Sequence, residues 1–141
     1  MELENKIYTR LPEDAKKIRT DVFVIEQGFK EEFDEQDNNA IHIVIYYQNV
    51  PIGTSRVIYS DKHHCYCIGR FAIVKEYRSK QFGKKLMEIT EDLIINKLGH
   101  ILVGVSSQER VADFYEKLGY QKTEERYLDQ DCPHIWMVKH L

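Results

Sequence analysis

A loop that carries basic side chains and a glycine is the segment whose chemistry is easiest to state. Residues 78–83 read Arg-Ser-Lys-Gln-Phe-Gly, and Lys84 and Lys85 follow directly. The apolar spacing after Gly83 predicts a helix that begins here, and a helix N-terminus offers unpaired N–H donors and the positive end of its dipole. Gly83 leaves room for a phosphate to come close to the backbone. The segment therefore predicts an anion site, although an ordinary basic loop also fits the spacing.

Three side chains of the metal-ligand type alternate before this loop. His63, Cys65 and Cys67 would share one face of an extended strand. A structural zinc site needs four ligands, and no fourth one is spaced to match. The 3 cysteines are an odd number, and free thiols in a reducing compartment are the simpler interpretation. We therefore expect no functional metal.

The elements that position these residues follow from hydrophobic periodicity and from turn residues. The predicted strands are residues 3–9, 41–47, 53–59, 63–74, 101–105, 121–128 and 134–140, with a bulge at Gly69. The predicted helices run from Pro12 to Gly28, from Gly83 to Gly99, and from the capping Ser106 and Ser107 to Gly119. The acidic residues 29–39 should form a loop or a short helical turn.

The order of these elements predicts one α/β (α+β) domain over residues 1–141. The strand–helix–strand stretch between residues 68 and 105 should be a right-handed parallel crossover, and the hairpins around it should be antiparallel. We therefore expect a mixed, largely antiparallel central sheet with helices on both faces.

Composition limits the class of function. The formal net charge is −3 and no basic face is evident, so we expect no nucleic-acid partner. No apolar run approaches the roughly 20 residues that cross a bilayer, and the N-terminus lacks the pattern of a signal peptide. We expect a cytoplasmic protein with no membrane partner, and a homodimer stays open.

Several segments together resemble the GNAT (Gcn5-related N-acetyltransferase) superfamily. Residues 78–83 resemble its acetyl-CoA loop, Q/R-x-x-G-x-G/A, and residues 69–78 resemble the strand that leads into that loop. Residues 111–120, Val-Ala-Asp-Phe-Tyr-Glu-Lys-Leu-Gly-Tyr, are similar to the family's A-x-x-x-Y-x-K-x-G-F helix. Residues 19–28 and 133–137 are similar to a bacterial subgroup of mostly uncharacterised members. The resemblance covers nearly the whole chain.

The resemblance implies an N-acetyltransferase that uses acetyl-CoA as cosubstrate, with direct attack by a primary amine of a small molecule or a protein. It assigns to acetyl-CoA the residues Phe71, Ala72, Ile73, Val74, Arg78, Ser79, Lys80, Gln81, Phe82, Gly83, Lys84, Gln108 and Tyr115. The chain departs from the family pattern at Gln81, where the loop usually has glycine, and at Gln108, where many members have Asn.

The resemblance also implies a general acid and leaves the general base open. Tyr115 would protonate the departing CoA thiolate, although its helical spacing alone favours a core tyrosine. The groups that could accept the proton of the amine are Glu26, Asp34, Glu35, Asp37, His42, His64 and His134. Glu26, near the end of the first helix, and His134, at the start of the last strand, rank highest.

Two other functions compete with acetyl transfer. An acyl-CoA-binding sensor without turnover would have the same fold, and Gln81 keeps that alternative open. A structural partner protein would use exposed aromatic residues, for which Tyr8, Tyr46, Tyr47 and Tyr59 are candidates. The acidic residues 31–37 favour a cationic acceptor if the chain is an enzyme.

Overall fold

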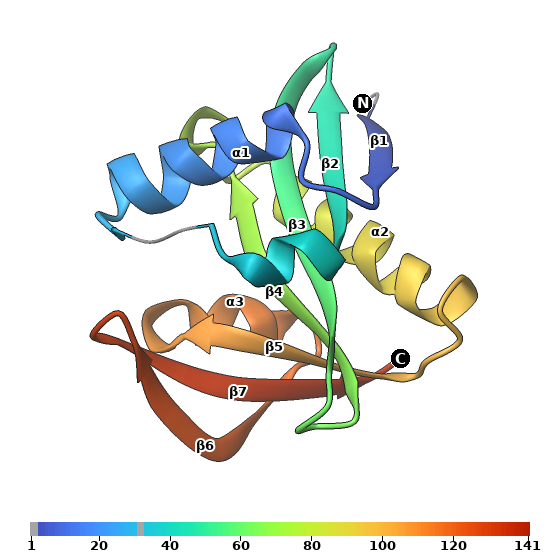
Figure 1. The fold of residues 1–141 in the computed structure, drawn as a ribbon, viewed down its shortest axis with the longest axis vertical. Helices are drawn as coiled ribbons and strands as arrows, with labels where there is room; N and C mark the ends of the chain where they lie inside the picture. The colour runs from blue at the N-terminus through green and yellow to red at the C-terminus, as the bar shows by residue number, and fades with distance from the viewer. Residues whose placement is uncertain (1–2, 31–32) are drawn as a thin grey trace.

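A mixed seven-stranded sheet runs through the molecule (Figure 1). The computed structural model describes residues 3–30 and 33–141, so Glu31 and Glu32 of the acidic segment lie outside the described residues. The strand order is β1-β2-β3-β4-β5-β7-β6. Neighbouring strands are antiparallel except for β4 and β5, which are parallel. This is the largely antiparallel sheet with one parallel crossover that the sequence predicts.

The strands are β1 (Leu3–Tyr8), β2 (Ile41–Tyr47), β3 (Val50–Ser60), β4 (Cys65–Ile73), β5 (Leu102–Gln108), β6 (Gln121–Asp129) and β7 (Cys132–His140). The α-helices are α1 (Glu13–Arg19), α2 (Phe82–Asn96) and α3 (Ala112–Lys117). Shorter helical segments are η1 (Thr20–Glu26), η2 (Glu35–Asn39), η3 (Lys75–Tyr77) and η4 (Glu109–Val111). Within the described ranges, none of the helices is long and apolar enough to span a bilayer.

Helices cover both faces of the sheet because successive strand residues point to opposite sides. In β2, Ile43 and Ile45 belong to the larger core, which also contains residues of α2 and α3. Val44 and Tyr46 belong to the smaller core beneath α1. Figure 1 shows α1 over the strands of the N-terminal half, whereas β5, β7 and β6 have no α-helix over them on that side.

The first helix changes its winding partway along. It is α-helical as far as Arg19 and continues as the π-helical segment η1 from Thr20 to Glu26. The β-branched run in this segment has low helix propensity, so the regular α-helical pattern is easily lost there. Gly28, with φ of +80°, ends the segment as predicted. Irregular π-turns often occur at functional sites, and this one places Glu26 and Gln27 at its end.

The prediction that Ser106 and Ser107 cap the last helix is wrong. Strand β5 continues to Gln108, because Ser106 and Ser107 pair with Trp136 and Ile135 of β7. Cross-strand pairing therefore outweighs the capping preference of serine, which is a local tendency only. The consequence is that Gln108 ends the strand directly opposite His134 in β7.

The parallel strands β4 and β5 separate partway along their length. Their register pairs run from Tyr66–Val103 to Ile68–Val105, yet β4 continues to Ile73 and β5 to Gln108. A bulge in β4 marks the point of separation: the register with β3 shifts there, and Arg70 has φ of +47°. The predicted bulge is therefore confirmed next to Gly69. Beyond Ile68 the two strands form an open wedge in the sheet.

Candidate active site

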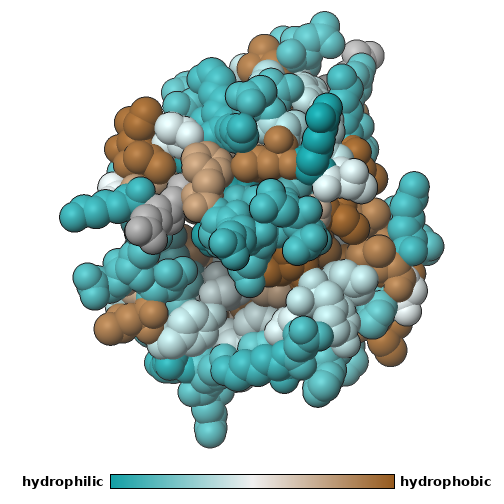
Figure 2. Space-filling view, in the orientation of Figure 1, coloured by the Kyte–Doolittle hydropathy of each residue, from teal (hydrophilic) through white to brown (hydrophobic). Residues whose placement is uncertain are grey.

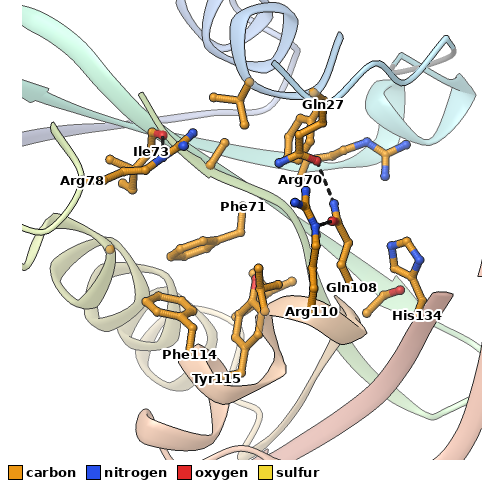
Figure 3. Close-up of a pocket in the computed structure, with 18 of the residues that line it drawn as sticks. Gln27, Arg70, Phe71, Ile73, Arg78, Gln108, Arg110, Phe114, Tyr115 and His134 are labelled. Carbon is orange, nitrogen blue, oxygen red and sulfur yellow. Dashed lines mark hydrogen bonds between the residues drawn. The ribbon is translucent and has the colours of Figure 1, made fainter. Parts of the chain in front are cut away.

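A cavity of about 870 Å³ occupies the wedge between β4 and β5. Phe71, Phe114 and Tyr115 line it on the side of α3 (Figure 3). On the α1 side its walls include His134 and Gln108, which are register partners and so point to the same face of the sheet. The cavity therefore passes through the sheet, and side chains from both faces of the sheet line it.

Most of the residues assigned to acetyl-CoA by the resemblance line this cavity. They are Phe71, Ala72, Ile73, Arg78, Ser79, Gln81, Gly83, Lys84, Gln108 and Tyr115. The side chains of Val74, Lys80 and Phe82 lie elsewhere. Phe82 is buried in the larger core, Val74 packs against the smaller core, and the ammonium of Lys80 lies 5.9 Å from the ring centre of Tyr77.

The basic loop keeps a glycine-like conformation without the glycine. Gln81, at the position where the family usually has glycine, has φ of 68° and ψ of 8°, in the left-handed region. Its carbonyl accepts a hydrogen bond from the Lys85 amide at 3.1 Å, so it forms the first turn of α2. A Cβ atom on Gly83 would lie 3.2 Å from the ring of Phe114, on the cavity wall. The start of α2 therefore faces the cavity with a bare backbone, as a bound phosphate would require.

Tyr115 lies at the centre of the aromatic wall. Its ring centre is 6.1 Å from that of Phe71, 5.1 Å from Phe114 and 6.0 Å from Tyr120. No protein group within the described ranges hydrogen-bonds its hydroxyl, and the side chain points from α3 into the cavity (Figure 3). Burial raises the pKa of Tyr115 above its ordinary value. The phenol therefore stays protonated and can act only as a proton donor near neutral pH.

His134 lies on the opposite side of the sheet from Tyr115, and one of its ring nitrogens already has a hydrogen-bond partner. Nδ1 is 2.8 Å from the carbonyl oxygen of Cys132, so it must carry the proton and donate to that acceptor. In the neutral ring Nε2 is then the unprotonated nitrogen. The ring of Tyr127 stacks on the imidazole, with ring centres 5.9 Å apart and an interplanar angle of 18°. His134 is thus held in the tautomer that a base needs.

Glu26 reaches the cavity but is committed to a partner. Its two carboxylate oxygens accept hydrogen bonds from the two terminal nitrogens of Arg78 at 2.5 and 2.8 Å. The Arg78 guanidinium holds the pKa of Glu26 below its ordinary value. Arg78 also donates from Nε to the carbonyl of Ile73 at 2.9 Å. Glu26 therefore joins η1 to the end of β4 and is a weaker candidate base than His134.

Asp34, Asp37 and His42 belong to a buried ionic network. Arg19 binds both oxygens of Asp37, at 2.9 and 3.2 Å, and Arg56 bridges Asp37 and Asp34 at 3.1 and 2.8 Å. Burial alone would raise the pKa of Asp37, but the hydrogen bonds and charge of Arg19 outweigh it and lower the pKa to about 2. His42 contacts the carbonyl of Asp37, and burial lowers its pKa. These groups connect η2 to the end of α1 and to β3, and they do not line the cavity.

One feature of the sequence indicates part of this network. Asp34 and Asp37 form a reciprocal capping box at the start of η2, and their spacing of three residues is the spacing of that motif. The other two candidate bases, Glu35 and His64, are exposed and do not line the cavity.

His63, Cys65 and Cys67, which alternate in the sequence, have different surroundings in the structure. His63 lies in the turn before β4, where Nε2 is 2.9 Å from Glu125 and the ring stacks on Trp136 with centres 3.9 Å apart. Cys65 and Cys67 lie in β4, and burial raises the pKa of Cys67 to about 12, so its thiol stays protonated. Within the described ranges no group of three His, Cys, Asp or Glu side chains is arranged to hold a metal.

A hydrogen-bonded bridge spans the cavity, and the sequence analysis did not predict it. Nε2 of Gln108 donates to Oε1 of Gln27 at 2.9 Å, and Oε1 of Gln108 accepts from Nε of Arg110 at 2.8 Å (Figure 3). The bridge joins the segment after η1 to the end of β5, 81 residues apart in sequence. Gln108 therefore reaches across the wedge, which a shorter Asn side chain at its position would do less readily.

A second, shallower groove of about 630 Å³ lies on the α1 side of the sheet. It shares Ser106 with the cavity, and its walls include Gln36 of η2, Tyr127 and Trp136. The hydroxyls of Ser106 and Tyr127 hydrogen-bond where the two spaces meet. Figure 2 shows this face hollowed below η2, with a mostly hydrophilic surface and separate apolar patches around the hollow. The groove gives a polar approach to the wedge on the side of His134.

Comparison with known proteins gives consistent matches over nearly the full chain. The family model of the acetyltransferase (GNAT) domain matches residues 11–141. A Bacillus subtilis protein provisionally named an acetyltransferase is 38% identical over 130 residues, covering 89% of this chain and 86% of the relative. A crystal structure provisionally named an N-acetyltransferase, from Lactobacillus plantarum, superposes with a TM-score of 0.87 at 27% identity, over 99% of this chain and 98% of the other.

One structural neighbour contains the cosubstrate. A GNAT family acetyltransferase from Elizabethkingia anophelis with acetyl-CoA bound superposes with a TM-score of 0.74, over 99% of this chain and 98% of the other. The identity is 16%, so this match bears on the fold alone.

Proposed function

This chain belongs to the GNAT acetyltransferase family, and we propose that it transfers the acetyl group of acetyl-CoA to a primary amine. The amine is carried by a small molecule or a protein and attacks directly, while both substrates are bound. The observation that carries the proposal is the wedge: a protonated phenol, Tyr115, lines it on one face of the sheet, and a free imidazole nitrogen of His134 lines it on the other.

The residues of the wedge fit a bound acetyl-CoA. The start of α2, with Gly83 and the left-handed Gln81, would hold the diphosphate, and Lys84 would add positive charge. The pantetheine arm would lie along Phe71–Ile73 of β4, where that strand no longer pairs with β5. When bound, acetyl-CoA supplies the activated acetyl group. Every other task falls to the chain itself.

The proton transfers follow from the positions of the two groups. The amine approaches along the groove on the α1 side and gives its proton to Nε2 of His134 as its nitrogen bonds to the thioester carbon. Tyr115 gives its proton to the sulfur as the carbon–sulfur bond breaks, so that CoA leaves as a thiol. Backbone N–H groups of β4 would stabilise the negative charge that develops on the thioester oxygen. Tyr115 and His134 then return to their starting states by proton exchange with water.

The choice of His134 over Glu26 rests on their hydrogen bonds. Glu26 would have to give up two contacts with Arg78 to accept a proton, and its lowered pKa opposes that. Nδ1 of His134 donates to the carbonyl of Cys132, and no group among the described residues hydrogen-bonds its acceptor nitrogen Nε2.

The test is a pair of histidine variants studied with acetyl-CoA and an accepted amine. His134→Gln should lower kcat/KM by about a hundredfold, the range of a positioned general base. His64→Gln, at an exposed turn outside the cavity, should match the wild type. If His134→Gln keeps the wild-type rate, the base lies elsewhere.

An acyl-CoA-binding sensor remains the alternative function. It would bind acetyl-CoA with the same residues but release no free thiol with any amine. Calorimetry and thiol release, measured on the same preparation, separate the two functions. We also propose a cytoplasmic location, which the free Cys65, Cys67 and Cys132 support.

A further inference from the structure

We propose that Gln27 donates a hydrogen bond from its side-chain amide to a carbonyl oxygen of the bound acyl-CoA, and that Arg110 sets the orientation of this amide through Gln108. The inference rests on the proposed function, because it requires an acyl-CoA in the wedge. It adds to that function a ligand-binding residue, Gln27, and a positioning residue, Arg110.

The location of Gln27 places its amide within the cavity. The residue follows the π-helical segment η1, and its side chain extends toward the end of β5 (Figure 3). It lines the same cavity as Phe71 and Tyr115. Of the three residues in the bridge, Gln27 is the one that reaches the wedge from the segment after η1, whereas Gln108 and Arg110 lie at and after the end of β5.

The donor and acceptor ends of both amides follow from the chemistry of Arg110. A guanidinium has N–H donors and no acceptor, so the Gln108 atom 2.8 Å from Arg110 Nε must be the amide oxygen. The other end of the Gln108 amide is then NH₂, which can only donate. Its partner 2.9 Å away must therefore be the oxygen of Gln27. One donor-only side chain thus fixes two amides that could otherwise be turned either way.

The same logic fixes what Gln27 can offer to a ligand. Its oxygen accepts from Gln108, so its NH₂ group is the end available to the cavity. Within the described ranges no protein acceptor takes a hydrogen bond from that group. An NH₂ group that faces an acyl-CoA site can donate a hydrogen bond to a carbonyl oxygen of the ligand. The acyl donor carries such oxygens in its thioester and in the amides of its pantetheine arm.

Arg110 differs from the other two arginines of the cavity. Arg78 pairs with Glu26, and Arg70 pairs with Asp34 at 3.3 Å. Among the described residues, no carboxylate lies within salt-bridge distance of Arg110, and its side chain donates a hydrogen bond to Gln108. Its side chain is therefore placed to hold the amide pair rather than to neutralise an acidic residue.

The first experiment removes the donor. Gln27→Leu keeps the side-chain size but has no N–H group, and kcat/KM for acetyl-CoA should fall about tenfold or more, which is about 1.4 kcal/mol. Gln121→Leu is the matched control, because Gln121 is exposed at the start of β6, lines neither the cavity nor the groove, and should behave as the wild type. If Gln27→Leu binds and turns over acetyl-CoA as the wild type does, the donor role is refuted.

A nuclear magnetic resonance titration identifies which carbonyl is bound. The side-chain amide signals of Gln27 are those absent from the spectrum of Gln27→Leu. A shift on adding acetyl-CoA but not CoA assigns the thioester oxygen, because CoA lacks that carbonyl, and a fall in kcat should accompany it. If acetyl-CoA and CoA cause a similar shift, the bound carbonyl belongs to an amide of the pantetheine arm. In that case Gln27→Leu should weaken binding and leave kcat little changed. If acetyl-CoA binds but moves neither signal, Gln27 does not contact it.

The second experiment tests the orientation. Arg110→Lys keeps a donor-only cation and should retain most of the activity, whereas Arg110→Met leaves both amides free to turn and should approach the loss seen in Gln27→Leu. An Arg110→Met enzyme as active as Arg110→Lys would refute the positioning role. Failure of the wild type to bind any acyl-CoA would instead contradict the proposed function itself, and that is seen before any variant is made.

Discussion

Two tyrosines of the same aromatic cluster should respond in opposite ways to loss of their hydroxyl groups. The rings of Tyr115 and Tyr120 lie 6.0 Å apart, and both are buried. Tyr115→Phe should lower kcat by about a hundredfold, or about 2.7 kcal/mol in the barrier, because the phenol is the proposed donor to the thiolate. KM for acetyl-CoA should change little, since the interaction acts in the transition state.

The effects on stability should follow the opposite order: Tyr120→Phe should lower the free energy of unfolding, and Tyr115→Phe should leave it nearly unchanged. The hydroxyl of Tyr115 has no hydrogen-bond partner among the described residues, so its removal should leave the free energy of unfolding within about 0.5 kcal/mol. The hydroxyl of Tyr120 donates to Glu91 at 2.8 Å, and Glu91 also pairs with Lys139 at 3.1 Å. Tyr120→Phe should therefore cost about 1 to 2 kcal/mol of stability while the remaining ion pair limits the loss.

Urea denaturation and steady-state kinetics on both variants measure the two effects. Tyr115→Phe should lose activity and keep stability, and Tyr120→Phe should lose stability and keep kcat. A Tyr115→Phe enzyme that turns over at the wild-type rate would make Tyr115 a packing residue. Equal losses of kcat in both variants would mean that the cluster supports activity only through the fold.

Three further predictions concern the loop and the buried network. Gly83→Asp should weaken acetyl-CoA binding at least about tenfold by calorimetry, and unchanged binding in the folded variant would place the cosubstrate elsewhere. Gln81→Gly should raise the free energy of unfolding by about 0.5 kcal/mol, because glycine removes about 1 to 2 kcal/mol of left-handed strain and costs less than that in unfolded-chain entropy; a loss of stability on denaturation would contradict the strain. The pKa of Asp37 falls from 3.8 to about 2 on folding, so stability should decline by about 2 kcal/mol as pH drops from about 4 to about 2. Asp37→Asn should remove that decline and cost about 3 to 5 kcal/mol, because Arg19 and Arg56 lose their carboxylate; an unaltered acid transition would show that another group controls it.

The sheet and its crossover were predictable because local signals agree with the fold. The apolar run before Val105, the glycines at the helix ends and the hairpin sequences all point to the elements that form. The predicted element boundaries that were wrong are those that pairing with a distant strand determines. Serine caps helices in isolation, but pairing with β7 keeps Ser106 and Ser107 in β5. The change to π-helical winding after Arg19 had no clear signal beyond a β-branched run.

The site was predictable where the residue types and the backbone carry the chemistry. The loop at Gly83, Tyr115 and His134 all line the cavity, and their roles in binding and catalysis stay predictions. What no motif indicated is how side chains from distant segments pair. Sequence spacing cannot show that Arg78 forms a salt bridge with Glu26, because 52 residues separate them. The same holds for Gln27 and Gln108, whose bridge exists only once η1 and β5 lie on opposite sides of the wedge.

The most direct test of acetyl transfer is mass spectrometry of an amine panel incubated with the protein and acetyl-CoA. At least one amine should gain a single acetyl group, free CoA should appear in equal amount, and both products should fall about a hundredfold with Tyr115→Phe. Acetyl-CoA binding without any acetylated product across the panel would contradict acetyl transfer, and the chain would then act as a sensor.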